Sequence, residues 1–190
     1  MNTSSDRPAI YVFFGLIATG KSTLAQAWAE RHGLAYANSD VVRKELAGLS
    51  PTASQKEGVD QGIYTREFSR KTYDALLARA EAAIGQGRGV ILDASYQNRE
   101  ERGKVVTLAS RLKTPVRFVL CDCDDAVKKA RLALRAQDPD AVSDGRWEIY
   151  LQQKARFETP TELAADQLVR LDTDLRIDAA LDKLDQLLQW

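Results

Sequence analysis

A glycine-rich loop that directly follows an apolar run is the feature that most limits how this chain folds. The run covers residues 9–14, and the loop at residues 15–23 reads GLIATGKST. The run has the composition of a buried parallel strand, and residues 23–30 continue as a helix-forming sequence. A strand, a loop of the form G-x-x-x-x-G-K-[ST] and a helix, in this order, are typical of a phosphate-binding loop (P-loop) in an α/β domain.

The chemistry of phosphate binding explains the residue types in this loop. The two glycines allow the backbone to curl so that successive N–H groups point at phosphate oxygens, and the following helix adds the partial positive charge of its N-terminus. Lys21 adds a point charge, and the hydroxyl group of Ser22 is a ligand for Mg²⁺. The residues expected to bind the nucleotide are Gly15, Ala18, Thr19, Gly20, Lys21, Ser22 and Thr23.

The composition limits what else the chain can be. A length of 190 residues with 44% apolar content allows a real core, and we expect one α/β domain over residues 1–190. Lys and Arg together number 27, as do Asp and Glu, so a global basic field of the kind found in nucleic-acid coat proteins is excluded. The sequence shows neither a secretory signal nor a membrane span, which predicts a cytoplasmic protein.

Strand-like runs alternate with helical patterns along the chain, which predicts a βαβ series and a parallel sheet. We expect strands near 9–14, 35–38, 88–93, 115–121 and 167–171, and helices near 22–32, 40–47, 63–85, 99–112, 124–137, 146–157 and 174–188. The irregular stretch 48–62 is expected to be either functional or disordered. Ligands of open parallel sheets bind beyond the carboxyl ends of the strands, so functional residues are expected just after each strand.

Asp40 and Arg43 follow the second expected strand. An aspartate at the start of a helix serves well as an N-cap, and capping alone would explain residue 40. The carboxyl end of this strand is, however, expected to face the γ-phosphate, and Arg43 lies one helical turn further on the same face. We predict that Asp40 accepts a hydroxyl proton and that Arg43 holds an anionic group, with capping or solvent exposure as the alternatives.

The third expected strand ends at Asp93. An apolar strand that ends in an acidic residue is the Walker-B pattern, in which the carboxylate holds Mg²⁺ directly or through a water molecule. We therefore predict that Ser22 and Asp93 bind the metal. Arg99 and Arg102 follow at the start of the next helix, where they either bind the substrate or belong to a solvated helix face.

A further set of cations lies on the expected helix 124–137. Lys128, Arg131 and Arg135 recur at helical spacing and share one face, and a turn-rich segment follows them. This pattern is typical of a hinged lid over a nucleotide, and a merely solvated basic face is the alternative.

Together these motifs resemble a group of small P-loop kinases that includes polynucleotide kinases, zeta toxins and chloramphenicol phosphotransferases, and more narrowly the bacterial predicted-kinase branch of that group. The resemblance covers nearly the whole chain. It rests on GLIATGKST, the D-x-x-R of Asp40 to Arg43, Asp93 with Arg99 downstream, and the R-x-x-x-R of Arg131 to Arg135 followed by Ser143-Asp144.

The resemblance implies a three-layer P-loop fold, with a five-stranded parallel sheet in the order 2-3-1-4-5 and a helical lid near residues 124–146. It also implies that ATP and Mg²⁺ are bound, that Asp40 is the general base, and that Arg43 grips a phosphate on the acceptor side. Arg131 and Arg135 would be lid residues, one near the adenine and one over the transferring phosphate. The 48–62 loop matches no family with a known substrate, so the resemblance does not extend to the acceptor.

The sequence therefore predicts a kinase that transfers the γ-phosphoryl group of Mg-ATP to a hydroxyl group of a small-molecule or nucleotide-like acceptor. Its predicted catalytic residues are Lys21, Asp40, Arg43 and Arg135. The transition state of such a transfer is loose, so positioning and electrostatics matter more than a strong base. A polynucleotide 5′-hydroxyl is an open alternative for the acceptor. Two other classes also stay open, a P-loop ATPase or GTPase and a nucleotide-binding regulatory module without an acceptor.

Overall fold

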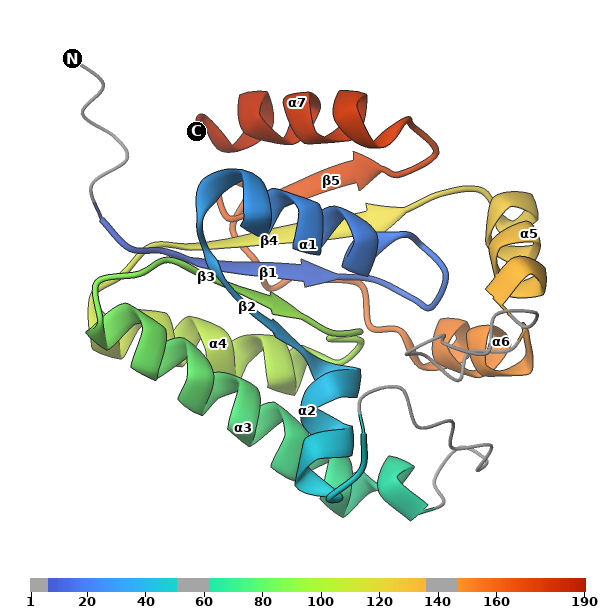
Figure 1. The fold of residues 1–190 in the computed structure, drawn as a ribbon, viewed down its shortest axis with the longest axis horizontal. Helices are drawn as coiled ribbons and strands as arrows, with labels where there is room; N and C mark the ends of the chain where they lie inside the picture. Colours follow the sequence, from blue (N-terminus) through green and yellow to red (C-terminus); the bar gives the residue numbers. More distant parts are fainter. Residues whose placement is uncertain (1–6, 51–61, 136–146) are drawn as a thin grey trace.

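The strands of this protein form one parallel sheet in the order β2-β3-β1-β4-β5 (Figure 1). The computed structural model describes residues 7–50, 62–135 and 147–190. The strands are β1 (Ile10–Phe14), β2 (Ala35–Asn38), β3 (Val90–Asp93), β4 (Val116–Asp122) and β5 (Leu168–Asp172). The predicted fold class and strand order are confirmed.

Helices connect successive strands, as the alternating pattern predicts. Within the described ranges they are α1 (Lys21–His32), α2 (Ser39–Leu46), α3 (Arg66–Gly85), α4 (Arg99–Leu112), α5 (Asp125–Arg135), α6 (Trp147–Arg156) and α7 (Ile177–Leu188), with a short 3-10 helix, η1 (Gly62–Tyr64), before α3. The largest differences from the expected ends are at the start of α3, expected at residue 63, and at the start of α7, expected at residue 174.

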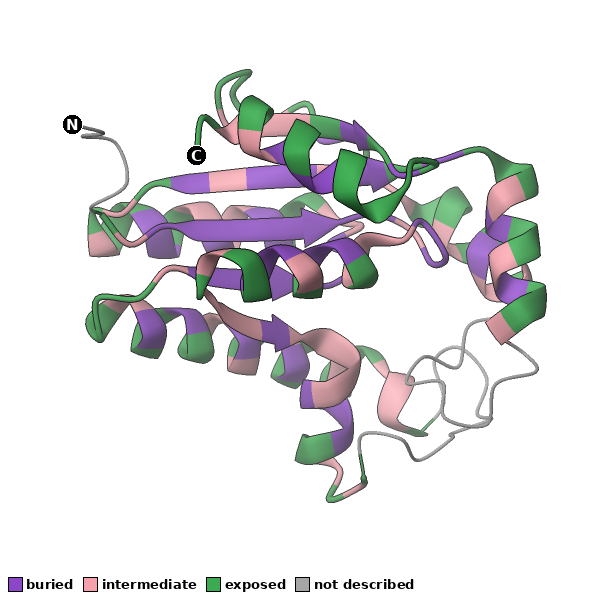
Figure 2. Ribbon diagram, turned by 45° about the horizontal axis from the view of Figure 1, so that its top comes forward, coloured by how far each residue is buried: buried purple, intermediate pink, exposed green. Residues whose placement is uncertain are grey.

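Both faces of the sheet are buried, and β1 shows why. All five of its residues are buried, and they alternate between two core clusters. Ile10, Val12 and Phe14 pack with apolar residues of α3 and α4, whereas Tyr11 and Phe13 pack with those of α1 and α7. This period of two is that of a strand covered by helices on both faces. The three layers are visible in Figure 1, and Figure 2 shows the buried strands between helices whose outer residues are exposed.

A smaller apolar cluster lies at the carboxyl end of the sheet, where α5 and α6 are placed (Figure 1). Ile17 and Ala18 of the glycine-rich loop pack there against Leu132 of α5 and Tyr150 of α6. The two helices therefore form a wall against the loop, beyond the strand ends.

Two predictions fall partly outside the described residues. Most of the 48–62 loop and the tip of the expected lid at 124–146, including Ser143-Asp144, belong to ranges that the structure does not describe. In the described ranges, no helix has both the length and the apolar character needed to cross a membrane.

Candidate active site

The glycine-rich loop between β1 and α1 has the backbone geometry of a tight turn around an anion. Gly15, Ala18 and Gly20 have φ angles of 141°, 63° and 79°, in the range that side chains rarely adopt. A side chain at Gly15 would also overlap the carbonyl group of Cys121 on β4. Gly20 is the N-cap of α1, so the loop delivers the chain directly to the positive end of a helix.

Hydrogen bonds hold the outer side of this loop in place. The Thr173 hydroxyl, just after β5, donates to the carbonyl oxygen of Thr19 and lies 3.0 Å from that of Asp122. Arg131 of α5 donates from Nη1 to the Ala18 carbonyl at 3.4 Å and from Nη2 to the Thr173 carbonyl at 2.7 Å. The visible role of Arg131 is therefore to fix the loop, and contact with the adenine stays a prediction.

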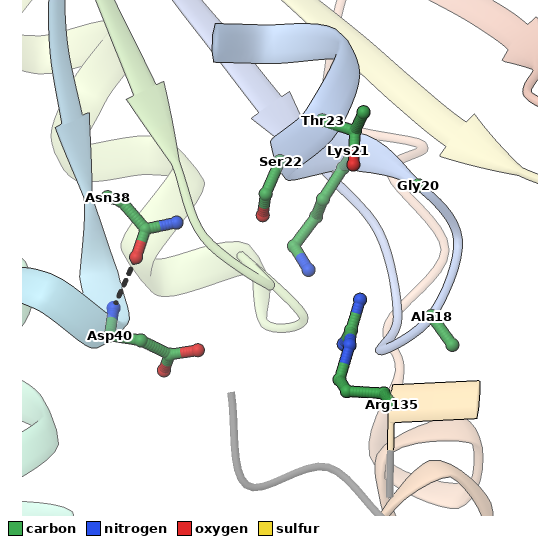
Figure 3. A pocket seen from close by; sticks show the side chains of 8 residues that line it. All are labelled: Ala18, Gly20, Lys21, Ser22, Thr23, Asn38, Asp40 and Arg135. Atoms are coloured by element: carbon green, nitrogen blue, oxygen red, sulfur yellow. Dashed lines mark hydrogen bonds between the residues drawn. The ribbon is translucent and has the colours of Figure 1, made fainter. Parts of the chain in front are cut away.

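One pocket of about 140 Å³ joins the loop to the neighbouring strand end (Figure 3). Its lining residues are Ala18, Gly20, Lys21, Ser22, Thr23, Asn38, Asp40 and Arg135. Figure 3 shows the ammonium group of Lys21 and the guanidinium group of Arg135 pointing toward each other from α1 and α5, with the Asp40 carboxylate across the pocket from them. A cationic site for phosphate groups and a carboxylate thus share one space.

Asp40 is not the cap of its helix. The side chain of Asn38 caps α2, because its Oδ1 accepts hydrogen bonds from the backbone N–H groups of Asp40 and Val41 at 2.9 and 3.1 Å. The capping alternative for Asp40 is therefore wrong. Burial raises the pKa of the Asp40 carboxyl group, while the nearby charges of Lys21 and Arg43 act in the opposite direction.

Asp93 ends β3 beside Asn38 and is not among the residues that line the pocket. It is fully buried, and its Oδ2 accepts hydrogen bonds from the Tyr36 hydroxyl at 2.7 Å and from the Asn38 amide at 2.6 Å. Among the described residues, its Oδ1 has no hydrogen-bond partner. A buried acceptor without a partner costs about 1–3 kcal/mol, so this atom suits a ligand such as a metal-bound water.

The side-chain oxygens of Ser22 and Asp93 fit a site for Mg²⁺ bound to ATP. Mg²⁺ keeps several waters and takes one or two protein oxygens together with phosphate oxygens, and Ser22 and Asp93 supply protein oxygens of this kind. The described residues contain no group of three or more His, Cys, Asp or Glu side chains arranged around a metal.

Arg43 does not line the pocket. Its guanidinium group donates from Nη1 to the Ile63 carbonyl at 2.8 Å and to the Ser69 hydroxyl at 3.2 Å, and its Cζ lies 5.1 Å from the centroid of the Tyr64 ring. It thereby fastens α2 to η1 and α3, and it is only 8% exposed. The prediction that Arg43 holds an anionic group of the acceptor stays untested.

Arg102 is a correction to the predicted set of acceptor-binding residues. Its side chain is fully buried, with Nε 2.5 Å from the Glu162 carboxylate and Nη1 donating to the Tyr96 carbonyl at 2.8 Å. Arg99 is exposed but lies 3.5 Å from the same carboxylate, and it is not among the residues that line the pocket. The two arginines therefore brace α4 against the segment before β5.

The basic face of α5 also differs from the prediction. Lys128 is buried and pairs with Asp122 at 2.8 Å and Asp125 at 3.2 Å, and Arg131 bonds the loop. Of the three predicted lid cations, only Arg135 is among the residues that line the pocket. The Asp125 carboxylate also accepts hydrogen bonds from Tyr150 and Lys154 at 2.5 and 2.9 Å, which join α5 to α6. That α5 belongs to a hinged lid stays a prediction.

Two contributors to the site were missed. Asn38 joins Asp93 to the start of α2, and Gln153 of α6 accepts a hydrogen bond from the Ile17 amide at 2.9 Å. An asparagine just before a helix is a capping signal, so the sequence holds a clue to Asn38. Gln153 comes after residues 136–146, which the structure does not describe. No capping or motif signal in the sequence links it to the P-loop.

The chain is similar in sequence to several known proteins. A family model described as "AAA domain" (AAA_33) matches residues 10–160. A shikimate kinase of Xanthomonas oryzae is 27% identical over 175 residues, which cover 89% of this chain and 95% of that protein. An uncharacterized protein of Mycobacterium tuberculosis is 30% identical over 118 residues, or 62% of this chain and 24% of that protein. The chain thus spans about a quarter of the length of its mycobacterial relatives.

Solved structures show the same fold. A putative kinase from Chloroflexus aurantiacus superposes with a TM-score of 0.71 at 20% identity, covering 96% of this chain and 99% of that one. The Mycobacterium tuberculosis APS kinase in complex with AMPPNP and APS gives a TM-score of 0.68 at 20% identity, covering 97% and 99% of the two chains. The chain has the fold of P-loop kinases, and it belongs to the AAA domain family AAA_33.

Proposed function

We propose that the protein is an ATP-dependent kinase that transfers the γ-phosphoryl group of Mg-ATP to a hydroxyl group of a small-molecule acceptor. The observation that carries this proposal is the shared pocket, in which Lys21 and Ser22 of the P-loop face the carboxylate of Asp40 (Figure 3). A carboxylate opposite a phosphate site is the arrangement that transfer to a hydroxyl group requires.

Each residue has a role that follows from its place. Lys21 and Arg135 stabilise the charge that develops on the phosphoryl oxygens. Asp40 orients the acceptor hydroxyl and takes its proton at a carboxylate oxygen, while the hydroxyl oxygen bonds to phosphorus and the bond to the ADP oxygen breaks. Ser22 and Asp93 would hold Mg²⁺, directly or through water, and the metal when bound neutralises phosphate charge.

A small molecule is favoured over a polynucleotide end because of the arginines. The cations expected to engage a strand are Arg43, Arg99, Arg102 and the lysines and arginines of α3, and of these Arg102 is buried and Arg43 bonds to η1 and α3. The likeness to a shikimate kinase over most of the chain supports the same preference. The finer assignment to the polynucleotide-kinase, zeta-toxin and chloramphenicol-phosphotransferase group stays a prediction.

The test is transfer of radioactive γ-phosphate from ATP to a panel of acceptors. The panel holds shikimate, gluconate, adenosine 5′-phosphosulfate, a set of sugars and an oligonucleotide with a 5′-hydroxyl end. Label in a small molecule, lost in Lys21→Ala, supports the proposal. Label in the oligonucleotide alone supports the polynucleotide alternative. ATP hydrolysis that no acceptor stimulates favours an ATPase, and tight binding without any turnover favours a regulatory module.

A further inference from the structure

The geometry points to Asn38 as a positioning residue that fixes the carboxylate of Asp93 relative to the helix that carries Asp40. The inference rests on the proposed function in one respect, because it takes Asp93 as the metal carboxylate of the site. It assigns to Asn38 a second role besides capping α2, namely that of presenting one chosen oxygen of Asp93 to the metal.

The two ends of the Asn38 amide have different partners. Its Nδ2 donates to Oδ2 of Asp93 at 2.6 Å, and its Oδ1 accepts from the N–H groups of Asp40 and Val41 at 2.9 and 3.1 Å. A carboxylate only accepts and a backbone N–H only donates, so the amide fits in one orientation. Strand register supplies this contact, since Asn38 and Asp93 are paired residues of β2 and β3.

Because of this contact, the two carboxylate oxygens of Asp93 differ in their hydrogen-bond partners. Oδ2 accepts from both Asn38 and the Tyr36 hydroxyl, whereas Oδ1 is buried and has no partner within the described ranges. Two donors on one oxygen hold the carboxylate in one rotation and leave Oδ1 as the free acceptor. Carboxylates that bind metals depend on such hydrogen bonds, and their loss typically lowers metal affinity about 10- to 100-fold.

The same amide determines where α2 begins. Because Oδ1 of Asn38 satisfies the first free N–H groups of the helix, it sets the direction in which α2 leaves β2. Asp40 is the second residue of that helix, and its carboxylate faces the pocket (Figure 3). One side chain thus sets both the metal side and the acceptor side of the pocket.

Four variants separate the two roles of Asn38. Asn38→Ser and Asn38→Asp keep a capping oxygen but lose the amide donor, and Asn38→Asp also places a second carboxylate beside Asp93. Asn38→Ala loses both roles. Tyr36→Phe is a parallel probe, because it removes the other donor to Oδ2 of Asp93, and with it an acceptor 3.4 Å from Asn38 Nδ2, while the capping oxygen of Asn38 stays in place.

The measurement is the affinity for AMPPNP by titration calorimetry, with and without Mg²⁺, together with the melting temperature. Neither reading needs an acceptor or turnover, so the inference stands or fails separately from the kinase proposal. For wild type we expect Mg²⁺ to increase the affinity. In Asn38→Ser this increase should shrink about 10-fold or more, while affinity without Mg²⁺ changes little. Asn38→Asp should lose more, and Tyr36→Phe should shift in the same direction. The melting temperature of Asn38→Ser should fall, because buried Asp93 loses a donor, but less than that of Asn38→Ala, which also loses the cap.

Two results would overturn the inference. If Asn38→Ser and Tyr36→Phe keep the full Mg²⁺-dependent gain, and only Asn38→Ala is altered, through a lower melting temperature, then Asn38 is a cap and nothing more. If wild type gains no affinity for AMPPNP from Mg²⁺, Asp93 is not a metal carboxylate and the role assigned to Asn38 is wrong.

Discussion

Lys21 carries the charge that the proposed reaction depends on most. Its ammonium group extends from the start of α1 into the pocket that the carboxylate of Asp40 also lines (Figure 3). We expect Lys21→Ala to lower phosphoryl transfer by about 10²-fold or more, because a positioned charge in a poorly hydrated site is lost. Steady-state rates at saturating ATP measure the effect, and circular dichroism shows whether the variant is folded. A folded Lys21→Ala protein with near-normal rates would contradict the kinase proposal.

A substitution of Asp40 separates an effect on catalysis from an effect on folding. Asn38 caps α2, so Asp40→Asn removes the proton acceptor without removing the cap. We expect turnover to fall by about 10²-fold, with ATP affinity and the melting temperature nearly unchanged. Burial disfavours the ionised carboxylate, and a neutral amide therefore brings no loss of stability at neutral pH. A collapse of the melting temperature with normal turnover of the remaining folded protein would show that the role of Asp40 is structural.

The pH dependence of the reaction reports on the same side chain. Burial raises the pKa of Asp40 above its ordinary value, and only the ionised carboxylate accepts a proton. Turnover should therefore fall as the pH decreases through this raised pKa, which places the acid limb above the range of an exposed aspartate, near 3.9. A profile of kcat against pH measures the limb. Its absence in Asp40→Asn, at a low constant rate, would identify the titrating group.

The positions of residues that belong to a local motif could be predicted from the sequence. The roles of residues whose partners are distant in the sequence could not. The P-loop, Asp40 and Asp93 follow from motif and position after a strand. The structure places residues of the P-loop and Asp40 at one pocket, and Asp93 bonds to Asn38 of its lining. The second role of Asn38 depends on the register between β2 and β3, which no motif encodes. The burial of Arg102 depends on Glu162, 60 residues further along the chain.

At the level of elements, the position of α4 depends on a buried ion pair. Arg102 is fully buried against Glu162, whereas Arg99 meets the same carboxylate from the surface. We expect Arg102→Ala to lower the free energy of unfolding by about 3 kcal/mol, because Glu162 loses its nearer partner and the Tyr96 carbonyl loses a buried donor. Arg99→Ala is the matched control and should cost under about 1 kcal/mol. Chemical denaturation measures both values. Equal effects of the two variants would mean that the Arg102 pair is not a buried support of α4.

The helices themselves were predictable, whereas the partners of their faces were not. The amphipathic pattern places α5 and α6 correctly, but the cations of α5 divide between Asp122 and Asp125, the P-loop backbone and the pocket. A pattern of charges shows that a helix has a polar face. Only the fold determines whether that face meets solvent, a carboxylate or a backbone carbonyl.

For the whole molecule, charge distinguishes the two kinds of acceptor. The chain has 27 basic and 27 acidic residues, so a nucleic-acid strand would have to be bound by a few local cations. Binding of a strand would weaken steeply with salt, with a slope of about −0.7 in log–log form for each phosphate contacted. We expect instead that the KM for the true acceptor changes little with salt. Acceptor kinetics over a range of KCl concentrations test this, and a steep slope would favour a polynucleotide.

The overall architecture was predictable in two stages. Alternating runs and helical patterns suffice for a parallel sheet covered by helices, because β1, buried on both faces, reads as a continuous apolar run. The strand order, in contrast, came from the resemblance to P-loop kinases, since the alternation alone leaves several orders open. The acceptor side had no sequence pattern to build on, and the 48–62 loop falls mostly outside the described residues.

The strand order also determines which half of the site unfolds first in local unfolding. β1 lies at the centre of the sheet and leads into the P-loop, whereas β2, which leads into Asp40, is an edge strand. Amide hydrogens of central, buried strands exchange with solvent most slowly, and edge elements open at lower free energy. We therefore expect partly unfolded molecules in which β2 and α2, with Asp40, are unfolded while the P-loop still binds a nucleotide.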